Sequence, residues 1–102
     1  MLIFMQLKTQ LYIDGKWVNG SSTLAVTDPS DESVIANVQV SSDKECADAV
    51  DAADRAFKSW AKTAPRVRGE ILRKAFEIMV AEADRLAEIV SRENGKVLTD
   101  AK

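Results

Sequence analysis

The side chains that could carry covalent or proton-transfer chemistry are few. The chain has a single cysteine, Cys46, and no histidine, which removes the commonest general base and the commonest transition-metal ligand. No histidine is therefore available to activate the Cys46 thiol. Because Cys46 falls on the apolar stripe of a predicted helix, we expect a buried thiol that behaves as a small hydrophobic residue.

Carboxylates and glycines are the other groups with chemical potential. Asp48, Asp51 and Asp54 recur every three residues on the polar side of the same predicted helix, where solvation explains them. The four glycines, at positions 15, 20, 69 and 95, are far apart, and none joins a strand to a helix with the spacing of a phosphate-binding loop. Neither a catalytic site nor a cofactor site is predicted from these residues.

Composition describes an ordinary soluble chain. Its 102 residues are 46% hydrophobic and 29% charged, enough for one domain with a small core. A net charge of −2 gives no electrostatic reason to expect a nucleic acid or an anionic membrane as partner. The apolar start "MLIFM" is too short for a signal-peptide core or a membrane span, and a lone cysteine fits a reducing, cytoplasmic setting.

The first third of the chain is typical of β-hairpins. Asp14-Gly15 separates two short runs rich in β-branched and aromatic residues, which predicts a hairpin from Leu11 to Val18. A second hairpin is expected from strand-forming Leu24 to Thr27, a turn at Asp28 to Asp31, and an apolar segment from Val34 to Val40.

From Ser42 onward the apolar period becomes helical. "SDKE" is a capping box that opens a helix from about Asp43 to Lys62, in which Ser42 and Glu45 satisfy each other's backbone donors. The apolar stripe of this helix consists of Cys46, Val50, Ala53, Phe57 and Trp60.

Pro65 begins the next helical stretch, since proline is tolerated in a first turn, and Gly95 is placed to end it in a left-handed conformation. Periodicity alone predicts one long helix between them. Its apolar face is wider than one neighbouring helix would cover, so we expect part of it to meet another structure. After "ENG" a helix-compatible pattern resumes at Lys96 and then stops, which leaves open whether the sequence is a whole protein or the front of a longer one.

Several sequence blocks, in order, resemble the N-terminal segment of the NAD(P)-dependent aldehyde dehydrogenase superfamily. The blocks are "YIDGKW", "DPSDESVIANV", "AVDAADRAFKSWAKTAPRVRGEILRKAFEIM" and "LAEIVSRENGKVLTDAK". The resemblance runs from Leu11 to Lys102 and is nearest to bacterial succinate-semialdehyde dehydrogenases. Asp28, where the family usually has asparagine, and Val97, where "GKP" is common, depart from the pattern and affect local turn geometry only.

The resemblance implies an α+β fragment: two short β-hairpins followed by two or three amphipathic helices, leading into a Rossmann-like α/β cofactor domain in the parent protein. It divides the chain into an N-terminal extension (1–10), a β-hairpin region (11–40) and a helical region (41–102), which together form an incomplete part of that domain. It also implies that the helix after Pro65 breaks in two near Ala81 to Asp84.

The same resemblance implies that the parent oxidises an aldehyde, with succinate semialdehyde as a candidate, using NAD or NADP. A cysteine thiolate attacks the aldehyde, hydride passes to nicotinamide, and a glutamate activates the water that hydrolyses the thioester. The residues for these roles lie beyond position 102, and Cys46 does not match the nucleophile's motif. The chain alone is therefore expected to be inactive and to bind no dinucleotide.

One site is implied within the chain itself. Several family members hold a sodium or potassium ion with oxygens from the strand before the proline turn and from an acidic residue before "GK". The matching positions are Val26 and Thr27, through backbone carbonyl or hydroxyl, and Glu93, and such oxygen ligands suit a hard cation. The alternative is that Glu93 is a solvated residue near a helix end.

Two partners follow from the fragment interpretation: the remainder of the parent chain, and a second copy through self-association. The alternative function is a free-standing α+β module that binds a protein through Val67, Ile71 and Leu72.

Overall fold

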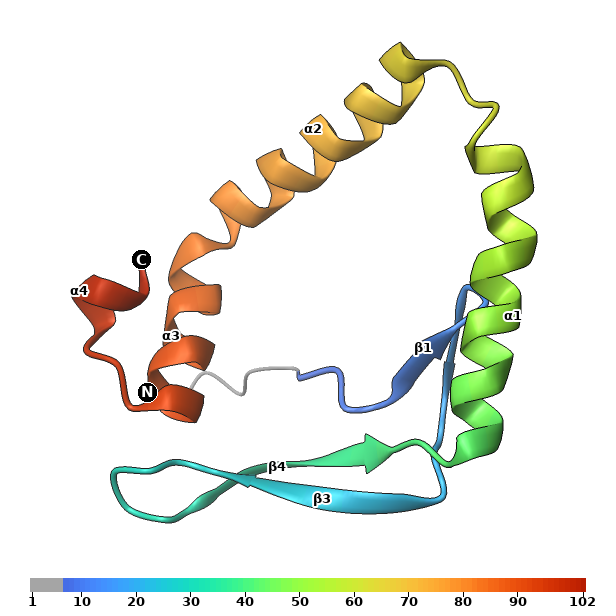
Figure 1. Ribbon diagram of the computed structural model, residues 1–102. Helices are drawn as coiled ribbons and strands as arrows, with labels where there is room; N and C mark the ends of the chain where they lie inside the picture. Colours follow the sequence, from blue (N-terminus) through green and yellow to red (C-terminus); the bar gives the residue numbers. More distant parts are fainter. Residues whose placement is uncertain (1–6) are drawn as a thin grey trace.

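The computed structural model describes residues 7–102, which form two β-hairpins followed by four helices (Figure 1). This arrangement confirms the predicted fold class, with three long helices and one additional single turn. The predicted N-terminal extension, residues 1–10, lies partly outside the described residues.

The first hairpin joins β1 (Leu11–Ile13) to β2 (Lys16–Val18) where it was predicted. Asp14 and Gly15 have φ of 51° and 76°, the left-handed pair that a two-residue hairpin turn requires. Tyr12 pairs with Trp17 across the strands, and their ring centroids lie 5.0 Å apart.

The second hairpin pairs β3 (Ser22–Thr27) with β4 (Val34–Val40), and its turn begins with Asp28 accepting a hydrogen bond from the Ser30 N–H at 2.8 Å. A β-bulge, which periodicity did not predict, interrupts the register between Val26 and Thr27. The two hairpins are separate sheets, linked where the Gln39 N–H donates to the Thr9 carbonyl at 2.8 Å.

Helix α1 (Asp43–Trp60) begins as predicted, with the Glu45 carboxylate accepting the Ser42 N–H at 2.6 Å, and ends two residues early. The expected burial of Cys46 is wrong: this thiol is exposed. The reason is that α1 packs beside β1 along a neighbouring face of small residues. That face consists of Ala49, Ala52, Ala53 and Ala56.

Helix α2 (Pro65–Ala81) and helix α3 (Ala83–Asn94) replace the single long helix that periodicity predicted. Glu82 leaves helical geometry, with φ −100° and ψ 13°, and ion-pairs with Arg85 at 2.6 Å just past the break. The break falls where the family resemblance placed it. Gly95 ends α3 with φ 71°, as expected, and α4 (Leu98–Ala101) follows.

The elements form an open frame rather than a closed globule (Figure 1), in which α2 spans the distance from α1 to α3. Among the described residues, only Ala52 and Ala87 are buried hydrophobic residues. The radius of gyration is 17.0 Å, whereas a compact domain of this length has about 13 Å. Residues 7–102 therefore contain almost no hydrophobic core.

Candidate cation site at the end of helix α3

The three residues expected to bind a cation come from two segments that the fold brings together. Val26 and Thr27 end β3, and Glu93 lies in the last turn of α3. β3 contacts α3, and a Cβ placed on Gly95 would lie 3.1 Å from the Cγ of Pro29. The end of α3 therefore lies against the turn that follows Val26 and Thr27.

Local sequence explains both halves of this arrangement. Gly95 adopts the left-handed cap, and its N–H donates to the Ser91 carbonyl at 2.9 Å, while the Ser91 hydroxyl donates to the Lys96 carbonyl at 2.7 Å. On the strand side, Val26 pairs with Ala36 and Thr27 with Val34. The regular ladder is thus interrupted at the two residues expected to supply strand oxygens.

The turn beside this junction carries a negative charge at neutral pH. Hydrogen bonds from Ser33, through its hydroxyl and then its N–H, lower the pKa of Asp31, and the positive charge of Arg92 in α3 acts in the same direction. The backbone part of this contact is the Ser33 N–H donating to Asp31 Oδ1 at 2.9 Å. The positive charge of Arg92 thus favours the ionised form of Asp31 across the junction between α3 and the turn.

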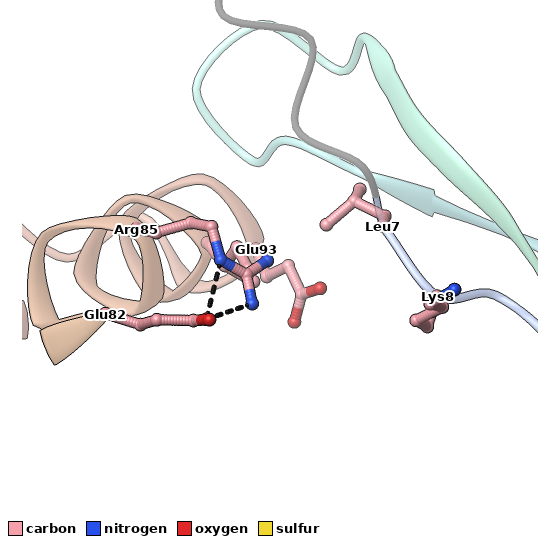
Figure 2. Close-up of a pocket in the computed structure, with 6 residues that line it drawn as sticks. Leu7, Lys8, Glu82, Arg85 and Glu93 are labelled. Carbon is pink, nitrogen blue, oxygen red and sulfur yellow. Dashed lines mark hydrogen bonds and ion pairs between the residues drawn. The ribbon is translucent and has the colours of Figure 1, made fainter. Parts of the chain in front are cut away.

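Glu93 also lines a pocket of about 570 Å³, shown in Figure 2, which reaches the segment before β1. Arg85 Nε and Nη2 donate to Glu82 Oε2 at 2.9 and 2.6 Å. Glu93 and Lys8 both line this pocket (Figure 2). Sequence reasoning missed this pocket because Lys8 is remote from α3 in the chain; the only local signal is the i, i+3 spacing of Glu82 and Arg85.

The oxygen chemistry of Val26, Thr27 and Glu93 fits a hard monovalent cation, because it offers one carboxylate together with neutral carbonyl or hydroxyl oxygens. Within residues 7–102, no cluster of three or more His, Cys, Asp or Glu side chains is arranged to hold a metal ion. Glu93 itself is exposed. The cation site stays a prediction.

No helix in the described part of the chain is both long and apolar enough to cross a membrane.

Comparison with known proteins identifies the family. A family model described as "Aldehyde dehydrogenase family" matches residues 17–102. Malonate-semialdehyde dehydrogenase of Bacillus pumilus is 43% identical over 93 residues, which are 89% of this chain and 19% of that protein. Succinate-semialdehyde dehydrogenase [NADP(+)] of Saccharomyces cerevisiae is 40% identical, covering 89% of this chain and 18% of that protein.

The fold agrees with these matches. The crystal structure of an aldehyde dehydrogenase from Brucella melitensis biovar abortus 2308 matches with a TM-score of 0.93 and 37% identity, over 99% of this chain and 22% of that one. The chain thus spans about a fifth of the length of the relatives it matches. It belongs to the aldehyde dehydrogenase family, of which it is an N-terminal segment.

Proposed function

We propose that these residues are the N-terminal part of a longer NAD(P)-dependent aldehyde dehydrogenase, an oxidoreductase that converts an aldehyde to the carboxylic acid. The observation that carries the proposal is that nearly the whole chain superposes on about a fifth of a dehydrogenase of the same fold. In the parent, residues 11–40 and 41–102 form part of the cofactor-binding domain, preceded by an extension at 1–10.

A semialdehyde is the proposed substrate class. Two relatives are named for malonate semialdehyde and succinate semialdehyde, short aldehydes that carry a carboxylate, and succinate semialdehyde is our first candidate. The yeast relative is named for NADP(+), which supports a nicotinamide cofactor, either NAD or NADP. The single cysteine fits a cytoplasmic protein.

The role of this segment is structural support. The sequence has no histidine to activate the exposed Cys46, and Cys46 does not match the motif of the family's nucleophile, so the thiolate nucleophile belongs to the remainder of the parent chain. By itself the segment is proposed to be catalytically inactive and to bind no dinucleotide. Within it, Val26, Thr27 and Glu93 are proposed to hold Na⁺ or K⁺ where α3 meets the β3 turn.

The test is to read the gene past codon 102, express the whole reading frame, and follow NAD(P)H formation with malonate and succinate semialdehydes. The 102-residue chain serves as the control. We expect turnover by the long protein with at least one semialdehyde and none by the short chain. A stop after Lys102 would contradict the proposal and favour the free-standing binding module.

A further inference from the structure

Helix α2 has an extensive uncovered apolar surface. It touches the rest of the described chain chiefly at its junction with α3. Seven large side chains on it are between 50% and 68% exposed, and we call them the α2 surface. They are Val67, Ile71, Leu72, Phe76, Ile78, Met79 and Val80.

The α2 surface is too wide for a single helix to cover. At about 100° per residue, it runs from Val67 around to Val80, an arc of about 220°. The remaining arc is polar and consists of Arg66, Glu70, Arg73, Lys74 and Glu77. An apolar stripe that faces one neighbour is about 100° wide. A second copy of α2 would therefore leave half of the α2 surface in water.

Arg68 lies within this apolar arc, about 60° from Ile71 on one side and about 40° from Leu72 on the other. It is half-buried, and its Nε atom is shielded from solvent without a hydrogen-bond partner among the described residues. A shielded donor without an acceptor is costly, so native structures supply one. The cover of α2 should therefore contain an oxygen acceptor opposite Arg68.

The surface that this chain exposes in excess of a compact protein is as large as a large protein–protein interface. The accessible surface of the chain is 8319 Å². A compact monomer of 11.2 kDa exposes about 5,700 Å², which leaves an excess of roughly 2,600 Å². Each partner in a standard protein–protein interface buries about 800 Å². Four-fifths of each dehydrogenase relative lies outside the matched segment and is large enough to supply this cover.

We propose that the α2 surface is a docking surface for the remaining part of the parent chain, and that Arg68 is its polar anchor, donating to a carboxylate or backbone carbonyl of that part. This inference rests on the proposed function. In this proposal Arg68 fixes the register in which α2 docks, because apolar contacts alone are not directional.

The experiment measures amide hydrogen exchange of α2 in the full-length protein and in the 102-residue chain. The variants are Arg68→Met, Arg68→Lys and the matched control Arg66→Met, whose arginine lies on the polar arc of the same helix. In the full-length protein we expect α2 amides to exchange about 100-fold more slowly than in the short chain. Arg68→Met should remove at least about tenfold of this protection, Arg68→Lys less, and Arg66→Met none.

Exchange of α2 that is as fast in the full-length protein as in the short chain would overturn the docking surface. Equal effects of Arg68→Met and Arg66→Met would overturn the anchor. Protection in the short chain that grows with its concentration would assign the surface to a second copy instead. If Arg68→Met prevents folding of the full-length protein, Arg68→Lys and Ile71→Ala supply the comparison with Arg66→Met.

Failure of the proposed function is recognised separately. If the α2 amides are protected in the full-length protein but the protein oxidises no aldehyde, the docking surface is supported and the proposed dehydrogenase activity is rejected. If the protein is an active dehydrogenase but its α2 amides are unprotected, the activity is supported and the docking surface is rejected. A reading frame that stops at codon 102 rejects both.

Discussion

Cys46 is exposed on α1, and its Sγ lies 3.1 Å from the Ser41 hydroxyl oxygen. We predict that in the 102-residue chain this thiol reacts with a thiol reagent at a rate within about tenfold of a small free thiol, because access limits the reaction little. Cys46→Ala should leave the helix content of the chain, measured by circular dichroism, unchanged. Stopped-flow labelling of the native chain checks this; labelling only upon unfolding would contradict the exposed position.

Glu45 links pH to the stability of α1. Hydrogen bonds from the Ser42 hydroxyl and then its N–H lower the pKa of Glu45 in the folded chain below its unfolded value. A lowered carboxyl pKa stabilises the fold above the unfolded pKa, and this stabilisation is lost as pH falls through the folded pKa. Glu45→Gln should therefore reduce the acid-dependent loss of helical circular dichroism.

The matched control for this titration is Glu70→Gln, which alters an exposed carboxylate in the middle of α2. Comparing it with Glu45→Gln isolates the contribution of the Ser42 contact from that of removing a carboxylate. Superimposable titrations of Glu45→Gln and the wild-type chain would show that the Ser42 contact has no energetic consequence.

At the scale of elements, local chemistry was sufficient where a residue dictates its own backbone. The first hairpin turn was predicted correctly from Asp14-Gly15, the start of α2 from Pro65, and the end of α3 from Gly95. Periodicity failed at Glu82, because no proline or glycine marks that break and the pattern of apolar residues continues across it. The bulge between β3 and β4 was also missed. Its position depends on how the two strands pair, and this pairing cannot be read from the sequence of either strand alone.

Burial was the property least predictable from sequence. The stripe of Cys46, Val50 and Phe57 on α1 was expected to form a core, yet Val50 and Phe57 remain 68% and 63% exposed. An apolar stripe indicates which face of a helix is to be covered but not which part of the protein covers it. For the candidate cation site, the residues were assigned by family resemblance, whereas the pocket beside Glu93 needed the fold.

Two glycine substitutions should have opposite effects on stability. Gly95→Ala places a Cβ on a residue with φ 71° and 3.1 Å from Pro29 Cγ, which should cost about 1 kcal/mol or more. Gly69→Ala adds a Cβ with no heavy atom within 4 Å in a helix interior, which should stabilise by about 0.5–1 kcal/mol. The helix content of the 102-residue chain, measured by circular dichroism, compares the two variants, and changes of the same sign would refute the assigned cap.

At the scale of the whole molecule, the hairpins and helices are well formed while the contacts between them are few. Figure 1 shows the frame, with α2 joined to its neighbours only near its ends. Stability in small domains comes mainly from a shared hydrophobic core, and two buried alanines among the described residues supply very little of one. The described residues thus form regular secondary structure but supply few of the contacts that give tertiary stability.

The 102-residue chain should consequently not persist as a cooperatively folded monomer. With an excess accessible surface of roughly 2,600 Å², much of it on α1 and α2, it should either self-associate or melt without a sharp transition. Light scattering across a dilution series, read beside thermal circular dichroism, distinguishes these outcomes. Association through α2 should be weakened by Ile71→Asp and not by Lys74→Asp on the polar arc. A monomer that melts cooperatively and independently of concentration would instead mean that the chain closes its own core, as an independent domain does.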